Sequence, residues 1–317
     1  MVYTLTLNPS LDYVMYPATY LKKGGTNRSE REELRAGGKG INVSVVLKNL
    51  DVPTKALGFI AGNTGDEIEG TVRSIGIRTG FIMLPFKNGM SRINVKIRVP
   101  YEDSSERGFE ETELNAAGPI VEDGSVDELC DQIERLSEGD VLVLAGSMPN
   151  QAPEDMLERI LSAVPENVKT VVDMTGDRLK RALPFGPFLV KPNLEELCQA
   201  AGRELKDEKE IISEAEKLQK SGAENVIVSM GADGAILLDK TGEIHRCKAP
   251  EGKALGAFGA GDSMTAGFIK GFLDEHDYGY ALKLGIAAGS AAVFEGKLPD
   301  YNEIMKVFDE VLRPSRK

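Results

Sequence analysis

The sequence predicts an α/β protein, with a mainly parallel β-sheet covered by helices on both faces and a smaller β-layer beside it. Short apolar runs alternate with helical patterns over most of the 317 residues, which is typical of parallel sheets connected by helices. Two segments break this alternation and predict the smaller layer. The length suits one large α/β domain with a small appendage, and the 41% of apolar residues is an ordinary globular content.

The strands of the main sheet are predicted where short apolar runs would be buried on both faces. In chain order they are residues 2–7, 55–60, 141–145, 170–173, 188–190, 225–229 and 235–238. The helices are predicted where apolar residues recur with helical spacing, between these strands and after them. They are residues 38–50, 153–163, 194–201, 208–221, 261–273, 280–294 and 301–312.

The smaller β-layer is predicted from residues 11–35, which are polar without a strong helical period, and from residues 91–99. The second segment alternates strictly between apolar and polar side chains, as a half-exposed strand does. Its polar face fits a lid over an anionic ligand, but it also fits a solvated edge strand whose charges prevent aggregation. We therefore expect a single domain over residues 1–317, with lid segments at about 11–35 and 88–112.

The formal net charge of −12 argues against nucleic acid and anionic membranes as partners, because like charges repel. An anionic substrate would need a locally positive site. Cys130, Cys198 and Cys247 lie far apart, which argues against a disulfide framework and a zinc site and favours a reducing compartment. Residues 1–7 resemble a strand and not a signal peptide, and no apolar run approaches the length of about 18 residues that spans a membrane. We therefore expect a cytoplasmic enzyme.

The most distinctive motif is the glycine-rich turn Gly-Ala-Phe-Gly-Ala-Gly-Asp-Ser at residues 256–263, which leads directly into an apolar helix. Glycines let the backbone approach a ligand closely and adopt positive φ. The N-terminus of a helix offers unpaired N–H groups and a partial positive charge, so this turn predicts an anion hole for a phosphoryl group. Asp262 at its mouth fits either a helix cap or a base beside the phosphate.

Two further glycine-containing turns are candidates for ligand binding. Residues 36–42 (Ala-Gly-Gly-Lys-Gly-Ile-Asn) open a predicted helix, and Lys39 and Asn42 can lie on one side of it. They suit a phosphorylated, hydroxylated ligand, or they are an exposed lysine and a capping asparagine. Residues 229–234 (Ser-Met-Gly-Ala-Asp-Gly) join two predicted strands, either as a plain hairpin turn or as a nucleotide phosphate loop.

Several standard motifs are missing from the sequence. It has no G-x-x-x-x-G-K-[ST] P-loop, no G-x-G-x-x-G fingerprint after the first strand and no G-x-S-x-G elbow. The missing fingerprint argues against an oxidoreductase that binds a dinucleotide on a Rossmann-type sheet. The two histidines, His245 and His276, lie outside the glycine-rich turns, so a general base is most easily a carboxylate.

Four motifs together resemble the ribokinase-like (PfkB) family of sugar kinases, in order and spacing, from residue 1 to about residue 295. Residues 259–262 (Gly-Ala-Gly-Asp) resemble its C-terminal signature, and residues 37–44 (Gly-Gly-Lys-Gly-Ile-Asn-Val-Ser) its N-terminal signature. Residues 8–12 (Asn-Pro-Ser-Leu-Asp) look like the opening of the phosphosugar branch, and residues 191–196 (Lys-Pro-Asn-Leu-Glu-Glu) like its Asn-x-x-Glu region. The resemblance implies a ribokinase-like three-layer αβα domain with a small β-sheet lid.

The resemblance also implies ATP and Mg²⁺ as cofactors and gives roles to residues of this sequence. Asp262 would be the catalytic base, and the anion hole would be formed by Gly259, Ala260 and Gly261. The acceptor sugar would contact Asp12, Gly38, Lys39, Asn42, Arg92 and Asn94. The nucleotide would contact Lys191, Asn193, Ser229, Gly231, Ala232, Asp233, Gly234, Gly289 and Ser290. Asn193 and Glu196 would organise Mg²⁺, mainly through water.

Within the family, the Asn-Pro-x-x-Asp motif at residues 8–12 and the Gly-Gly-Lys-Gly turn at residues 37–40 resemble the branch of 1-phosphofructokinases and tagatose-6-phosphate kinases. Residues 111–115 (Glu-Thr-Glu-Leu-Asn) look closer to the 1-phosphofructokinases. The implied reaction is ATP-dependent phosphorylation of a ketohexose monophosphate, with fructose 1-phosphate giving fructose 1,6-bisphosphate. Tagatose 6-phosphate and fructose 6-phosphate are alternative acceptors. Lys39 and Arg92 are the candidates for binding the substrate's own phosphate. A non-catalytic sugar-phosphate sensor on the same fold is a hypothesis of another class.

The sequence departs from the family pattern in two places. Ala257 stands where the family usually has Thr or Ser, and the bulky Phe258 follows it, so the anion-hole turn loses a hydroxyl contact and is expected to pack differently. Asp51 stands after the first predicted helix, where a glycine is common. The exposed lid strand could also pair with the lid of a second copy to make a homodimer.

Overall fold

The large sheet forms the centre of the molecule and confirms the predicted α/β class. A computed structural model of the chain describes residues 1–100 and 109–313, so part of the predicted lid segment at 88–112 lies outside the described residues. The sheet has nine strands in the order β13-β12-β11-β10-β9-β8-β1-β4-β5. Its strands are β1 (Val2–Thr6), β4 (Thr54–Ala61), β5 (Arg78–Leu84), β8 (Val141–Ala145), β9 (Lys169–Asp173), β10 (Leu189–Val190), β11 (Asn225–Ser229), β12 (Ala235–Leu238) and β13 (Ile244–Cys247).

The sheet is parallel from β5 to β11 and ends in two antiparallel pairings, β11 with β12 and β12 with β13. All seven predicted strands are present, each within a residue or two of its expected ends. The sequence patterns do not predict β5 and β13. Both lie at the edges of the sheet, where one side of the strand is exposed, so neither carries the continuous apolar run of a strand buried on both faces.

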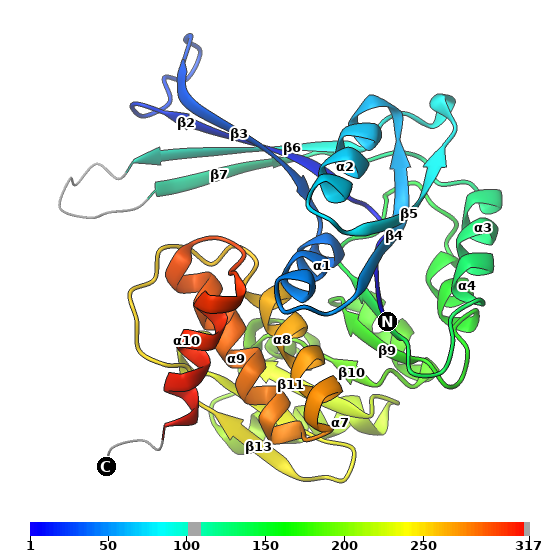
Figure 1. Ribbon diagram of the computed structural model, residues 1–317, viewed down its shortest axis with the longest axis vertical. Helices are drawn as coiled ribbons and strands as arrows, with labels where there is room; N and C mark the ends of the chain where they lie inside the picture. The colour runs from blue at the N-terminus through cyan, green and yellow to red at the C-terminus, as the bar shows by residue number, and fades with distance from the viewer. Residues whose placement is uncertain (101–108, 314–317) are drawn as a thin grey trace.

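Helices cover both faces of the sheet, as Figure 1 shows. One face packs against α1 (Lys39–Asn49), α8 (Ala260–Glu275), α9 (Tyr278–Glu295) and α10 (Tyr301–Leu312). The other packs against α3 (Asp123–Ile133), α4 (Met156–Ser162), α5 (Asp177–Ala182), α6 (Leu194–Ala201) and α7 (Glu208–Lys220). Both faces need covering because the central strands are apolar on both sides. In β8, Leu142 and Leu144 pack in one core, and Val141 and Val143 pack in the other.

Helix α2 (Gly62–Ser74) packs on a third core between the two sheets. The seven predicted helices are all present, but α2, α3 and α5 are additional. The sequence pattern did not predict α2 because this helix contains three glycines and buries only two apolar side chains, Ile68 and Val72, which is too few to show a helical period. Among the described residues, no helix is long and apolar enough to cross a membrane. The three cysteines are free.

The predicted smaller layer is a four-stranded sheet in the order β3-β2-β6-β7. Its strands are β2 (Ser10–Pro17), β3 (Ser29–Gly37), β6 (Arg92–Pro100) and β7 (Phe109–Asn115). We call it the small sheet; it projects from the main body at the upper left of Figure 1. Its register gives it two unlike faces. Arg35, Asp12, Asn94 and Asn115 align in one row across the four strands, and Leu34, Tyr13, Val95 and Leu114 align in the next.

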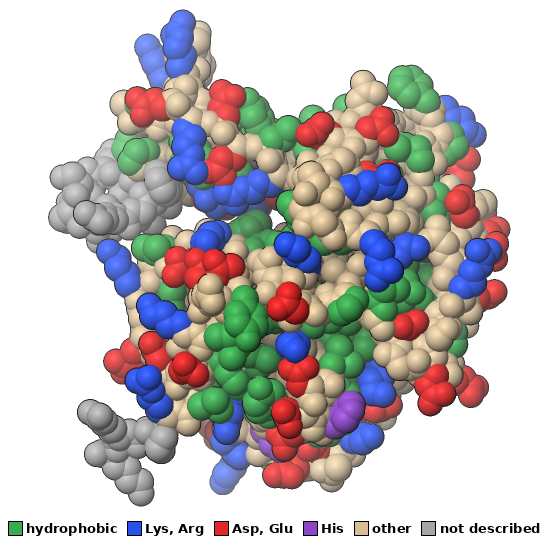
Figure 2. Space-filling view, viewed as in Figure 1, with side chains coloured by type: hydrophobic (Ala, Val, Ile, Leu, Met, Phe, Trp, Pro, Cys, Tyr) green, Lys and Arg blue, Asp and Glu red, His purple; other side chains and the backbone are tan. Residues whose placement is uncertain are grey.

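The polar face of the small sheet is turned toward the main body. Asn94 is buried and the Lys96 side chain is 11% exposed, whereas the neighbouring Ile93 is 37% exposed. The interpretation of β6 as a solvated edge strand with outward charges is therefore wrong. Figure 2 shows Lys and Arg side chains gathered on the small sheet, where it borders a hollow above the main body.

Candidate active site

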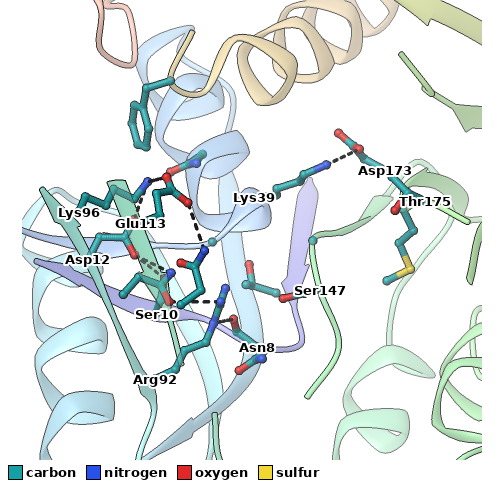
Figure 3. A pocket seen from close by; sticks show the side chains of 18 of the residues that line it. Asn8, Ser10, Asp12, Lys39, Arg92, Lys96, Glu113, Ser147, Asp173 and Thr175 are labelled. Atoms are coloured by element: carbon teal, nitrogen blue, oxygen red, sulfur yellow. Dashed lines mark hydrogen bonds and ion pairs between the residues drawn. The ribbon is translucent and has the colours of Figure 1, made fainter. Parts of the chain in front are cut away.

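A polar cavity of about 550 Å³ lies between the small sheet and the carboxyl ends of the central parallel strands. This is the edge at which open α/β sheets bind ligands. Segments far apart in the chain converge here, namely the ends of β1, β8 and β9, the start of α1, and strands β2, β6 and β7 (Figure 3). All six residues predicted to bind the acceptor line this cavity: Asp12, Gly38, Lys39, Asn42, Arg92 and Asn94.

Asp262 lies in the first turn of α8 and is buried, with 6% of its surface exposed. The helix cap is Gly259, with φ of +67°, and Asp262 makes no capping hydrogen bond, so the interpretation of Asp262 as a cap is wrong. Asn42 Nδ2 donates to Asp262 Oδ2 at 2.7 Å. Burial, reinforced by the charge of Asp173, raises the pKa of Asp262 to about 6. A buried carboxylate with such a pKa is suited to accept a proton near neutral pH.

Asp173, at the end of β9, is the main site residue that sequence reasoning missed. It is almost fully buried and forms ion pairs with Lys39 Nζ at 3.0 Å and Lys191 Nζ at 3.3 Å. Burial alone would raise its pKa, but the two ammonium groups outweigh burial and hold the pKa of Asp173 below its ordinary value. The one available signal was an aspartate at the carboxyl end of a predicted parallel strand.

The small-sheet end of the cavity holds a second polar network. Asp12 Oδ1 accepts from Ser10 Oγ at 2.6 Å and from Asn94 Nδ2 at 3.2 Å. Asp12 Oδ2 lies 3.6 Å from Lys96 Nζ, which also pairs with Glu113 at 3.1 Å. The sequence placed Lys96 on the polar face of its strand, but neither it nor Glu113 was singled out as a site residue, because only the register of β2, β6 and β7 brings them together.

Lys39 and Arg92 lie at different ends of the cavity. Figure 3 shows Lys39 extended toward Asp173, while Arg92 lies beside Asn8. Arg92 Nε donates to the Asn8 carbonyl at 3.0 Å, and burial lowers the pKa of its guanidinium. Both residues line the same cavity, and which of them binds the substrate's own phosphate stays a prediction.

A second cavity of about 610 Å³ adjoins the anion-hole turn. Much of its lining is small or apolar, including Ile286, Val293 and Phe294, as a flat aromatic base requires. Eight of the residues predicted for the anion hole and the nucleotide lie on its wall: Ser229, Gly231, Ala232, Gly234, Ala260, Gly261, Gly289 and Ser290. Asp233 and Gly259 are not among the lining residues. The glycine-containing turn at residues 229–234 is a hairpin that joins the antiparallel strands β11 and β12.

Lys191 and Asn193 lie just before α6, and Glu196 lies in its first turn. A methyl group built on Gly261 would lie 3.3 Å from Lys191 Nζ, so this lysine borders the turn directly. Asn193 and Glu196 form a reciprocal capping box on α6: Asn193 Oδ1 accepts from Glu196 N at 2.8 Å, and Glu196 Oε2 accepts from Asn193 N at 2.9 Å. Glu196 also lines the polar cavity. Asn193 and Glu196, the two residues expected to organise Mg²⁺, thus also cap the N-terminus of α6.

Comparison with known proteins agrees with this geometry. The model of the pfkB family carbohydrate kinases matches residues 5–300. The chain belongs to this family. It is 38% identical to a 1-phosphofructokinase of Bacillus subtilis over 98% of both chains. It is 32% identical to a D-tagatose-1-phosphate kinase of Bacillus licheniformis, again over 98% of both chains. Among solved structures, Escherichia coli phosphofructokinase-2 in complex with fructose-6-phosphate superimposes with a TM-score of 0.88, at 27% identity, over 98% of this chain and 99% of that one.

The family confirms the resemblance stated from the four sequence motifs, and it confirms the ribokinase-like fold with a small second sheet. Membership makes the chain a phosphotransferase whose acceptor is a hydroxyl group of a carbohydrate. The comparisons assign no role to single residues.

Proposed function

We propose that this kinase transfers the γ-phosphoryl group of ATP to fructose 1-phosphate and forms fructose 1,6-bisphosphate. One observation carries the proposal: the hydrogen-bonded pair Asn42–Asp262 connects the walls of the two cavities. Asn42 lines the polar cavity, and Gly261, next to Asp262, lines the apolar one. A base placed between an acceptor site and a nucleotide site is what direct phosphoryl transfer requires. The 38% identity to a 1-phosphofructokinase supports this choice of acceptor.

In the proposed reaction, Asp262 accepts the proton of the sugar hydroxyl as its oxygen attacks the γ-phosphorus, and ADP leaves with the electrons of the broken P–O bond. Asn42 orients the carboxylate. The backbone N–H groups of Gly259 and Gly261 stabilise the charge on the transferred group, a contribution typically worth a few kcal/mol for each donor, whereas the Ala260 N–H donates to the Ala257 carbonyl. Lys39 and Lys191 add positive charge beside them, and Asp173 holds both ammonium groups in place.

The remaining roles follow from the two cavities. Asp12 and Asn94 would hold sugar hydroxyls, and Arg92 would hold the substrate's own phosphate at the small-sheet end. The apolar cavity would take the adenosine, with Gly289 and Ser290 beside the base. Glu196 and Asn193 fit Mg²⁺ held through water, since each already uses an oxygen in the capping box; the ion would neutralise the phosphates. The small sheet would act as a lid that excludes water from the reaction.

The deciding experiment measures ADP release with ATP and Mg²⁺ on four acceptors: fructose 1-phosphate, fructose 6-phosphate, tagatose 1-phosphate and tagatose 6-phosphate. We expect the highest kcat/KM on fructose 1-phosphate. The similarity to a D-tagatose-1-phosphate kinase makes the tagatose phosphates the second candidates. Turnover on none of the four would reject the proposal.

We also propose that the small sheets of two copies pair through their outer faces. Three apolar side chains lie exposed on this face, Leu34 at 50%, Ile93 at 37% and Leu114 at 63%, and no described segment of the chain covers them. Light scattering on a Leu114→Glu variant tests this: the wild type should have the mass of a dimer and the variant that of a monomer. A monomeric wild type would refute the pairing.

A further inference from the structure

Phe258, at the corner of the anion-hole turn, is not explained by the reaction proposed above. Residues 257–260 form a tight turn, in which the Ala260 N–H donates to the Ala257 carbonyl at 3.3 Å and Gly259 has φ of +67°. The Phe258 side chain is half-buried at this corner. The ring of Phe258 reaches the polar face of the small sheet.

The partners of the ring are two cations. Lys96 Nζ lies 5.2 Å from the ring centroid and Arg35 Cζ lies 5.7 Å from it, within the range of cation–π attraction. Lys96 is also held near Asp12 Oδ2 at 3.6 Å. Lys96 shares β6 with Arg92, so Phe258 connects the anion-hole turn to the strand that carries the proposed phosphate ligand.

Phe258 also closes the side of the polar cavity. A smaller hollow of about 240 Å³ lies between β3, α1 and α2, and Phe258 and Asn42 line both spaces. These two side chains therefore form the wall between them. Asn42 donates to Asp262, so loss of the ring would open a second path for water to the proposed base.

We propose that Phe258 is a positioning residue that holds Lys96 at the acceptor cavity and keeps water from Asp262. The inference rests on the proposed function. In the reaction it suppresses, a water oxygen attacks the γ-phosphorus of ATP, the water proton passes to Asp262, and the P–O bond to ADP breaks. The products are ADP and inorganic phosphate, without a phosphorylated sugar.

The first test compares ADP and sugar bisphosphate formed by the wild type and by Phe258→Ala, Phe258→Leu and Phe258→Trp. We expect Phe258→Ala to raise the KM of the sugar phosphate roughly 5- to 20-fold, the loss of two cation–π contacts of ordinary strength. It should also release ADP in excess over bisphosphate. Compared with Phe258→Ala, Phe258→Leu should bring the ratio of ADP to bisphosphate closer to one but leave the KM raised. Leucine fills the space of the ring but has no π face for the cations. Phe258→Trp should preserve both.

The matched control is Phe86→Ala, because Phe86 is 88% exposed in the connection before β6. It should leave the KM and the product ratio unchanged. Circular dichroism and thermal melting check that the variants fold. A wild-type KM together with one ADP per bisphosphate in a folded Phe258→Ala would overturn the inference.

The second test does not depend on turnover. The chain contains no tryptophan, so Phe258→Trp introduces a single indole whose emission can be excited selectively. Addition of fructose 1-phosphate without ATP should change that emission, because the ligand binds beside Lys96. If the wild type turns over none of the sugar phosphates, the proposed function is rejected. A change in emission would then still support the contact between residue 258 and the acceptor cavity at Lys96. Unchanged emission in an active variant would count against it.

Discussion

Replacing Asp262 by asparagine should lower turnover by orders of magnitude and at the same time make the protein more stable. The carboxylate is buried, and its pKa of about 6 in the folded state lies above the ordinary value of 3.8. A group whose folded-state pKa is raised favours folding when protonated, so its contribution is lost as the pH rises from about 4 through 6. At pH 7 the difference of about 2 units corresponds to a cost of about 3 kcal/mol.

Asparagine keeps the size of the side chain and an oxygen for the Asn42 amide, but it carries no charge to bury. Asp262→Asn should therefore gain up to about 3 kcal/mol at pH 7 in urea unfolding, and the gain should narrow as the pH is lowered to 5. Its kcat should fall roughly 10²- to 10⁴-fold, the usual loss of a general base. The Kd for the acceptor should change little. In the wild type, kcat/KM should decline below about pH 6 as Asp262 takes up a proton.

The control is Asp274→Asn, near the other end of the same helix, where the carboxylate is exposed and pairs with Lys270. It should alter neither kcat nor stability by a measurable amount. An Asp262→Asn protein that keeps its kcat would refute the role of base. One that loses activity together with stability would show that Asp262 supports the fold instead of the reaction.

Three further predictions concern other residues. Asp51→Gly should stabilise the protein by about 1 kcal/mol in urea unfolding, because Asp51 has φ of +58°, which disfavours a side chain; Asp51→Ala, which keeps the Cβ, should not. Lys191→Met should cost about 3 kcal/mol in the same assay, since it removes one partner of the buried Asp173, and adding Asp173→Asn should recover most of that loss. Arg92→Leu should raise the KM of the sugar phosphate roughly 10- to 100-fold, the effect of a lost charge-assisted contact, and leave the KM of ATP unchanged; a parallel rise in both would contradict its placement at the acceptor.

Features that depend on local sequence were predictable. The strands at 141–145 and 225–229 match their predictions at both ends, because a run of apolar residues buried on both sides is visible without knowing its neighbours. The glycine-rich turn at 256–263 identified a helix N-terminus, since few other residues allow the φ of +67° found at Gly259. The four motifs in order were sufficient for the family.

Contacts between distant segments were not predictable from these patterns. Asn42 and Asp262 are 220 residues apart, and the residues around Asp262 by themselves fitted both a helix cap and a base. The polar face of β6 could have pointed to solvent or to the cavity; pairing with β2 and β7 decided it.

The sequence alone thus determined the class of fold, the turns that approach a phosphoryl group and the family. The tertiary structure decided which side chains meet there, including Asp173, Lys96 and Phe258. The physical reason is that helical period, strand alternation and glycine conformations are set by neighbours a few residues away, whereas burial, pKa and ion pairing depend on charges that the fold brings together from across the chain.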